Sequence, residues 1–218
     1  MAIKVSQFIF KIITFKGENM VNFEAKTEKG IQKQQHIMRV ALSLFEKFGY
    51  DKVSVDRIVK ESKTSKGSFY QHFPSKSSIF MMRFMEMDEK YEKLYSNIKL
   101  EHTLAADRLE AFCLSVYTSI DKEMGKELMK VIYSAAIIDQ EHTFFTSESR
   151  KLYQIILEII DDGTKDGTLK NVKSSKQFFQ IIIQTLMGSI YYWGLQSDDR
   201  SLVETGAPLI QHIVKAYQ

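Results

Sequence analysis

Two prolines, Pro74 and Pro208, are the only ones in a chain of 218 residues, and glycines number just ten. Proline removes a backbone donor and glycine is conformationally permissive, so both residue types tend to interrupt helices. Few interruptions, together with no strand-like alternation of apolar and polar residues, predict long helices joined by turns. We therefore expect an all-α fold.

The first strong helical signal runs from Gln32 to Phe48. Its apolar residues recur at spacings of 4, 3, 1 and 3, at Ile37, Ala41, Leu44, Phe45 and Phe48. This spacing places them on one helix face. Gly49 follows directly and suits a C-terminal cap.

Two short helices follow, each preceded by a serine whose side chain can accept a hydrogen bond from the first turn. Ser54 is the expected N-cap of one, and Ser65 of another that runs through Phe73 before Pro74. Together with the helix before them, of about 16 residues, these two helices of about 8 residues each form a helix-turn-helix arrangement. The helix-turn-helix motif itself is placed at residues 54–73.

The rest of the chain is also expected to be helical. Ser75 should cap a long helix from Lys76 to about Ile98. Further helices are predicted near 103–121, 125–140, 147–162, 175–196 and 201–216.

The helix that begins after Ser65 has the outward chemistry of a recognition helix. A major groove is about 12 Å wide, and a small residue such as Gly67 allows close approach to it. The helix N-terminus can donate backbone N–H groups to a phosphate. Tyr70, His72 and Lys76 can donate further hydrogen bonds to the DNA backbone, and Gln71 could bond a base edge.

Three stretches in fixed order carry a resemblance to a known family. They read Ala41-x-x-Leu44-Phe45-x-x-x-Gly49-Tyr50, then Ser54-Val55-x-x-Ile58-Val59, then Ser65-Lys66-Gly67-Ser68-Phe69-Tyr70-Gln71-His72-Phe73-Pro74-Ser75-Lys76. The order resembles the N-terminal domain of TetR/AcrR-type regulators. It implies an all-α homodimer that binds a palindromic operator, usually as a repressor, and that a ligand releases.

By position, the resemblance implies that residues 64–71 face the groove and that Tyr70, His72 and Lys76 hold phosphates. The full predicted DNA-binding set is Ser54, Lys63, Thr64, Ser65, Lys66, Gly67, Ser68, Tyr70, Gln71, His72 and Lys76. Lys63 is a departure, because many family members have glycine there. In a left-handed conformation, lysine would cost roughly 1 kcal/mol relative to glycine.

The distribution of charge also separates the predicted DNA-binding region from the rest of the chain. Residues 31–76 hold nine Lys or Arg and four Asp or Glu, a net charge of +5, whereas residues 77–218 hold sixteen and twenty, a net charge of −4. A basic unit joined to an acidic one suggests a polyanionic partner for the first only. We expect a DNA-binding domain over 31–91 and a ligand-binding and dimerisation domain over 92–218.

Residues 1–30 are expected to form an N-terminal extension. Lys16-Gly17-Glu18-Asn19 can be encoded by a purine-rich sequence that resembles a ribosome-binding site, at a suitable distance before Met20. One interpretation is that translation starts at Met20. The alternative is a native tail, and the sequence leaves both open.

The C-terminal region suggests subunit pairing. The predicted helix 175–196 is apolar on more than one face, which indicates burial on more than one side. We expect a subunit interface there, and the family resemblance adds helix 147–162 to it; the alternative is a central core helix of a monomer. The interface candidates are Phe179, Ile183, Leu186, Met187 and Ile190.

The same region is predicted to bind a small hydrophobic or amphipathic effector. Candidate pocket residues are apolar or aromatic with an occasional hydroxyl, as small-molecule sites tend to be, although such residues more often belong to the ordinary core. They are Phe84, Tyr91, Phe112, Tyr117, Tyr133 and Tyr192.

Several function classes find no support. The sequence lacks a glycine-rich phosphate loop and the HExxH, CxxC and GxSxG motifs, and its five histidines are not at helical pairing distances. We therefore expect no catalytic residues, no metal and no cofactor. One cysteine, Cys113, and no run of roughly 18 apolar residues suit a cytoplasmic protein. The alternative function is a helical small-molecule-binding bundle or enzyme that does not bind DNA.

Overall fold

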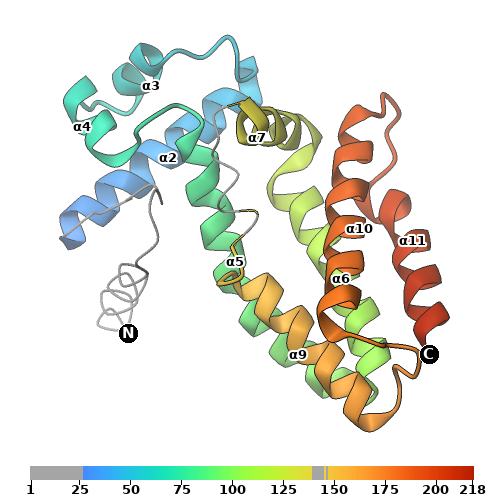
Figure 1. Cartoon of the computed structure of the whole chain (residues 1–218). Coiled ribbons are helices and arrows are strands. Elements are labelled where there is room, and N and C mark those ends of the chain that lie inside the picture. Colours follow the sequence, from blue (N-terminus) through green and yellow to red (C-terminus); the bar gives the residue numbers. More distant parts are fainter. Residues whose placement is uncertain (1–26, 139–144, 146) are drawn as a thin grey trace. The chain divides into compact units, whose positions relative to one another are not determined.

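The computed structural model describes residues 27–138, 145 and 147–218, and within these ranges every regular element is an α-helix (Figure 1). The all-α prediction is therefore confirmed. The extension predicted at 1–30, with its possible start at Met20, lies outside the described residues up to residue 26. No helix within the described ranges combines the length and the hydropathy needed to cross a membrane.

The chain forms two compact units that meet between Arg83 and Phe84. The sequence-based boundary, after residue 91, was placed eight residues later. Helix α5 (Ser78–Glu101) contributes to both units. A boundary inside a continuous helix carries no turn signal, which is why the sequence does not mark it.

In unit 1, helix α2 (Glu28–Phe48) begins four residues before its predicted start at Gln32. The Thr27 hydroxyl accepts a hydrogen bond from Gly30 N at 3.1 Å and so caps it. Gly49, at φ 81°, ends the helix by donating to Phe45 O at 2.8 Å.

Helices α3 (Val55–Glu61) and α4 (Lys66–His72) start where their serine caps predict. Ser54 Oγ accepts from Arg57 N at 3.2 Å, and Ser65 Oγ accepts from Ser68 N at 3.1 Å. Phe73 has an extended backbone and closes α4. The helix-turn-helix predicted at 54–73 is thus present.

Aromatic side chains form the core of unit 1. The rings of Phe45 and Phe80 are 5.0 Å apart, and those of Phe69 and Phe73 are 5.7 Å apart. Ile58, Phe69 and Phe73 have no exposed surface. Because these residues point inward, the short helix α4 is anchored on one side and keeps its other side for solvent.

Helix α5 begins at Ser78, two residues after the predicted Lys76. The Ser75 hydroxyl does accept a hydrogen bond from a backbone N–H, but from Ser78 N at 3.1 Å. The intervening residues form a turn in which the Ser75 and Ser77 hydroxyls lie 2.7 Å apart.

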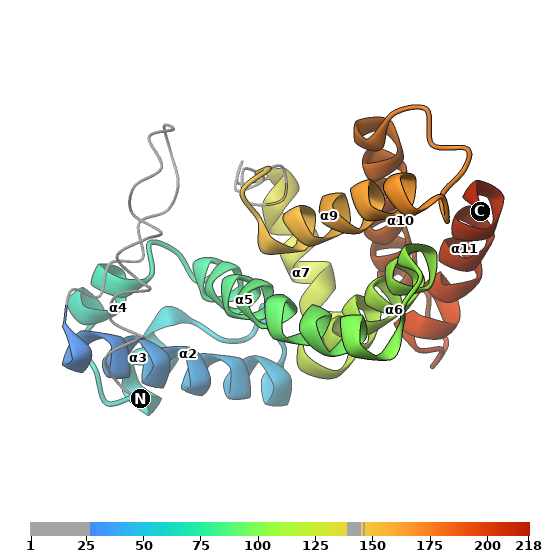
Figure 2. The same cartoon turned by 90° about the horizontal axis from the view of Figure 1, so that it is seen from below.

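Among the described residues, unit 2 contains five helices besides its part of α5. They are α6 (Ala105–Glu123), α7 (Gly125–Ile138), α9 (Lys151–Asp166), α10 (Ser175–Leu195) and α11 (Leu202–Tyr217). Helix α6 contacts α7, α9, α10 and α11, while α10 also contacts α7, α9 and α11 (Figures 1 and 2). Helices α6 and α10 therefore lie at the centre of this unit.

Candidate DNA-binding surface and ligand cavity

Most of the predicted DNA-binding residues lie on the surface of unit 1. Seven are exposed: Ser54, Lys63, Ser65, Lys66, Gly67, Tyr70 and Gln71. Tyr70 exposes 51% of its surface while its ring meets the buried Phe69 ring edge-on at 5.3 Å. Thr64 and Ser68 are half-buried, and the Ser68 hydroxyl oxygen itself is buried. Helix α4 thus presents its tyrosine, glutamine and lysine outward on a rigid base.

The turn between α3 and α4 is held by backbone and side-chain hydrogen bonds. Thr64 N donates to Val59 O at 3.0 Å, and the Ser62 and Thr64 hydroxyls lie 2.8 Å apart. The His36 Nε2–H group of α2 donates to Ser62 O at 3.1 Å. Lys63 has φ 53°, so a lysine does occupy the left-handed position, at a cost of roughly 1 kcal/mol.

Lys66 makes an ion pair that the sequence analysis missed. Its ammonium lies 2.7 Å from Asp56 Oδ1 of α3, and both side chains are largely exposed. The hydrogen bond and the charge of Asp56 raise the pKa of Lys66. Asp56 therefore orients this lysine at the start of α4 and partly offsets its charge there.

Two predicted phosphate contacts do not present their donors to solvent. The Lys76 ammonium donates to Tyr50 O at 2.8 Å and to Val53 O at 2.9 Å, and lies 3.8 Å from the Tyr50 ring centroid. It thereby ties down the loop between α2 and α3. His72 is only 5% exposed, and burial lowers its pKa, which favours the neutral imidazole. The phosphate-binding role predicted for both residues stays a prediction, and this placement does not support it.

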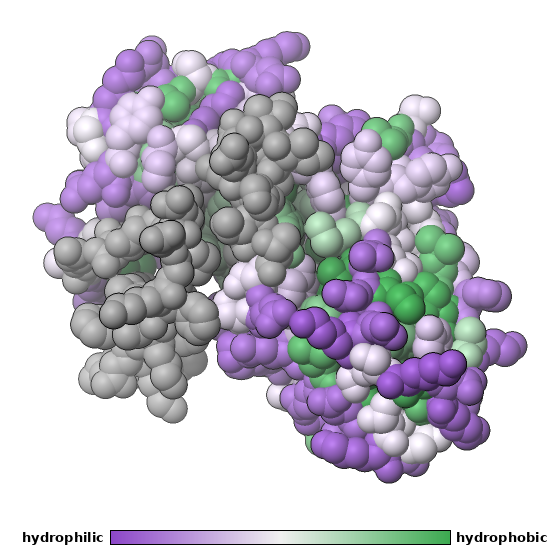
Figure 3. Space-filling view, viewed as in Figure 1, coloured by the Kyte–Doolittle hydropathy of each residue, from purple (hydrophilic) through white to green (hydrophobic). Residues whose placement is uncertain are grey.

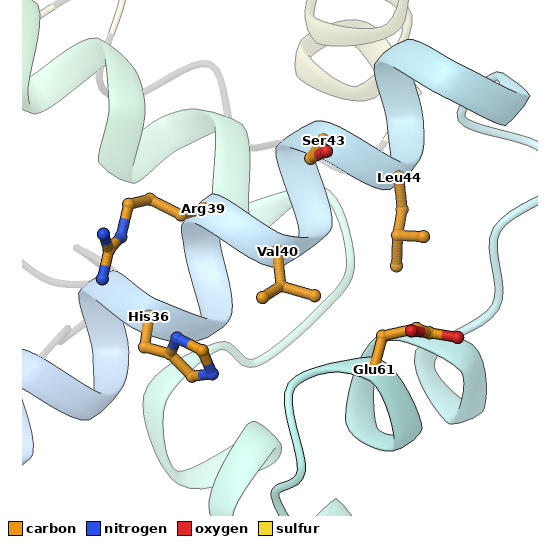
Figure 4. A pocket seen from close by; sticks show the side chains of 6 residues that line it. All are labelled: His36, Arg39, Val40, Ser43, Leu44 and Glu61. Carbon is orange, nitrogen blue, oxygen red and sulfur yellow. The ribbon is translucent and has the colours of Figure 1, made fainter.

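A shallow hollow lies on the outer side of α2, next to the end of α3 (Figure 4). It measures about 400 Å³ and is open to solvent. Its lining mixes two apolar side chains with polar and charged ones: Val40, Leu44, His36, Arg39, Ser43 and Glu61. Ligand sites are usually more enclosed and more apolar, so we do not assign the effector to it.

An enclosed cavity of about 30 Å³ lies inside unit 2. Phe84, Tyr91 and Tyr133 line it, as predicted for a ligand pocket. Three other candidates lie outside its lining, and their role in ligand binding stays a prediction. Phe112 packs between the Tyr91 and Tyr95 rings, Tyr117 is fully buried, and Tyr192 is 59% exposed.

The residues predicted for dimerisation lie inside the same unit. Four of them line the cavity: Ile183, Leu186, Met187 and Ile190. The fifth, Phe179, packs against the Tyr153 ring with centroids 5.3 Å apart. The apolar residues that α10 exposes are different ones: Ile181, Tyr191, Tyr192 and Leu195. Ile183, Leu186 and Ile190 are buried in the protomer, whereas Phe179 and Met187 are half-buried. The dimerisation role of this set stays a prediction.

Residues 37–81, which span most of α2 and all of α3 and α4, match the family model described as bacterial regulatory proteins of the tetR family. This segment of the chain is therefore similar to the N-terminal domain of tetR-family regulators. The resemblance seen in the sequence is thereby confirmed.

Individual proteins agree with the match of this segment. The chain is 39% identical over 67 residues to YuxN of Bacillus subtilis, an uncharacterized HTH-type transcriptional regulator; the match covers 31% of this chain and 22% of YuxN. It is 22% identical over 181 residues to YdgC of the same organism, another uncharacterized HTH-type regulator, covering 73% of this chain and 93% of YdgC.

A solved structure extends the similarity in fold beyond this segment. It is that of Thermus thermophilus FadR, a TetR-family transcriptional repressor in complex with lauroyl-CoA. The TM-score is 0.67 at 17% identity, over 84% of this chain and 93% of that one. At this identity the likeness establishes the fold.

Unit 2 also carries a buried ion pair that the sequence analysis missed. Arg150 and Asp88 are 7% and 6% exposed, and Arg150 Nη2 lies 3.1 Å from Asp88 Oδ1. Asp88 occupies the inward stripe of α5 next to Met87 and Tyr91, where an acidic residue needs a partner. That position was the available signal, although it does not identify Arg150.

Proposed function

We propose that this chain is a DNA-binding transcriptional repressor that a small amphipathic molecule releases from a palindromic operator. The observation that carries the proposal is the two-sided character of α4. Its aromatic side chain Phe69 is fully buried, while Lys66, Tyr70 and Gln71 are exposed on the outer side. A short helix anchored in this way can enter a major groove without losing its support.

A homodimer is part of the proposal, because each recognition helix reads only a few base pairs. Two copies must be held about 34 Å apart, one turn of DNA, to read two half-sites. Helix α10 offers a surface for this purpose. Its exposed fractions are 36% at Ile181, 51% at Tyr191, 59% at Tyr192 and 65% at Leu195. Figure 3 shows hydrophobic side chains gathered over α10.

Helix α11 suits the proposed interface better than α9 does. Leu209 of α11 is 52% exposed, and α11 lies against α10. The exposed residues of α9 are polar: Gln154, Glu158, Asp161, Thr164, Lys165 and Asp166. We therefore place the interface on α10 and α11 in preference to the predicted pair 147–162 and 175–196.

The dimer is tested by introducing charge on α10. Replacing Tyr191 and Leu195 with glutamate should convert the dimer to a monomer, because like charges would be buried against their copies. Native mass spectrometry reports the mass directly. Leu100→Glu is the matched control, because Leu100 is a leucine of α5 that is 87% exposed, and it should leave the dimer intact. A variant that stays dimeric would contradict this placement.

The effector is proposed to enter the cavity of unit 2. Its walls are apolar and aromatic, and FadR with lauroyl-CoA shows that this fold can hold an acyl-CoA. A volume of about 30 Å³ holds roughly one water molecule, so a ligand must widen it. The flexible side chains of Met129 and Met187 line the cavity and can give way.

Release would follow if the ligand favours one position of α5 over another. This helix contributes Phe84 and Tyr91 to the cavity and begins at Ser78, shortly after α4 ends. A differential affinity of a few kcal/mol between two states is sufficient for such coupling.

A binding titration tests the function. The full chain is mixed with a labelled duplex taken from directly upstream of its own gene, and with a scrambled duplex. If the protein neutralises several phosphates, affinity should fall about 10³-fold between roughly 50 and 200 mM salt. Lauroyl-CoA should then release the upstream duplex. Equal affinity for both duplexes, or binding that ignores salt, would contradict the proposal.

The alternative, a ligand-binding bundle or enzyme that does not bind DNA, is not favoured by the family match. Burial raises the pKa of the Cys113 thiol to about 12, so this cysteine is a poor nucleophile. Among the described side chains, no group of three or more His, Cys, Asp and Glu is arranged to hold a metal ion. We propose a non-enzymatic regulator that acts in the cytoplasm, where its DNA is.

A further inference from the structure

The cavity of unit 2 is apolar except at one place. Aliphatic residues form much of its wall, namely Val116, Ile120, Leu152, Ile183, Leu186 and Ile190. Arg150 is the one charged residue among the described residues that line it. An apolar wall with a single cation matches a molecule that has an apolar chain and one negative charge.

Asp88, the ion-pair partner of Arg150, also accepts hydrogen bonds from backbone groups. Arg150 Nε and Nη2 both donate to the same Asp88 oxygen, Oδ1, at 3.2 and 3.1 Å. The other oxygen, Oδ2, accepts from Lys151 N at 2.6 Å, and Oδ1 also accepts from Leu152 N at 3.4 Å. Asp88 therefore caps α9 and would keep these backbone donors if the guanidinium turned away.

The geometry of the Arg150 guanidinium would also allow it to pair with another anion. The pair has both nitrogens on one oxygen, whereas the strongest arginine–carboxylate pairs place two nitrogens on two oxygens. The guanidinium carbon lies 5.0 Å from the Tyr153 ring centroid and 5.9 Å from that of Phe145. Both rings line the cavity, so Arg150 is positioned along its wall.

Two phenols of the cavity, those of Tyr91 and Tyr133, add no negative charge. Burial raises the pKa of Tyr91 and of Tyr133, so both hydroxyls stay protonated near neutral pH. The Tyr133 hydroxyl donates to Met187 O at 3.2 Å. Charge selection inside the cavity therefore depends on Arg150.

We propose that the cavity binds an anionic amphiphile, and that Arg150 pairs with its anionic group in exchange for Asp88. The inference rests on the proposed function and narrows its ligand class. A neutral amphiphile of the same chain length offers nothing in place of the Asp88 carboxylate and should bind more weakly.

Isothermal titration calorimetry on the full chain tests this with three probes of equal chain length: dodecanoate, lauroyl-CoA and 1-dodecanol. We expect the wild-type protein to bind at least one anionic probe about 10-fold more tightly than dodecanol. Dodecanoate would place a carboxylate at Arg150. Binding of lauroyl-CoA alone, lost in Arg150→Gln, would assign the anion to the CoA phosphates. Dodecanol that binds as tightly as both anions, or no binding by any probe, would overturn the inference.

Three variants separate ligand pairing from a purely structural role. Arg150→Gln should abolish the preference for the anion. Asp88→Asn should raise the affinity for the anion about 10-fold, because the asparagine oxygen can still cap α9 but no longer competes as a charge. Arg108→Gln is the matched control: Arg108 pairs with Asp162 at 3.2 Å, away from the residues that line the cavity, and its loss should leave the preference unchanged.

Asp88→Asn keeps the test decisive even if Arg150→Gln does not fold. A purely structural pair predicts weaker binding of all probes in Asp88→Asn, which is the opposite result. Affinity of the wild-type protein for the upstream duplex is measured in parallel. If that duplex is bound but charge preference is missing, only this inference fails; if the duplex is not bound, the proposed function fails by itself.

Discussion

Operator affinity should fall about 1000-fold when Lys66, Tyr70 and Gln71 are all replaced with alanine, a loss of about 4 kcal/mol. These three side chains point outward from α4. A base contact contributes about 1–3 kcal/mol of discrimination, and phosphate contacts add to overall affinity. Because all three are exposed, the variant should keep the fold and its melting temperature.

Fluorescence anisotropy with the upstream and scrambled duplexes measures both affinity and specificity. Lys66→Ala alone should weaken both duplexes to the same degree and lower the salt dependence, whereas Gln71→Ala should mainly reduce the preference for the upstream duplex. The control is Lys170→Ala with Lys173→Ala, two exposed lysines between α9 and α10. If the triple variant binds the upstream duplex like the wild type, α4 is not the recognition helix.

The helix-turn-helix could be predicted because its signals are local. A serine cap and the N–H it accepts lie three residues apart, so Ser54 and Ser65 fixed the starts of α3 and α4. The left-handed position of Lys63 was raised by the family pattern, not by any property of lysine. Local chemistry therefore located the elements, and the resemblance identified what they do.

The direction of individual side chains could not be predicted, because distant residues decide it. Lys76 finds the carbonyl groups of Tyr50 and Val53, 26 and 23 residues earlier in the chain. His72 is enclosed by the packing of α4. The sequence does not distinguish a long basic side chain that binds a phosphate from one that donates hydrogen bonds to a loop of its own protein.

For helix α10, the sequence also does not reveal which face of the helix is buried. Apolar residues surround it, so periodicity does not reveal which side turns inward. Leu186 and Ile190 are buried, while Tyr191 and Leu195 are exposed. The helices α7, α9 and α11 that cover α10 decide this, and their positions follow from tertiary packing.

Gly206→Ala is expected to destabilise the protein by about 3 kcal/mol, at the upper end of what one added methyl group costs in a packed core. Gly206 lies in α11 against the Tyr117 ring of α6. A Cβ atom at Gly206 would sit 2.4 Å from Tyr117 Cε2 and 2.5 Å from Cζ. Tyr117 has no exposed surface, so its ring has no room to turn away and α11 must move instead.

Urea unfolding measures this loss, and a double-mutant cycle assigns it to the clash. Tyr117→Leu alone should also destabilise, since it removes a buried ring, but combining it with Gly206→Ala should cost less than the sum of the two. Gly67→Ala is the control, because its added Cβ would meet no atom closer than Ser65 Oγ at 4.0 Å and should leave stability equal or slightly higher. Additive losses would mean that α6 and α11 are not in this close contact in solution, and the packing that shapes unit 2 would need another explanation.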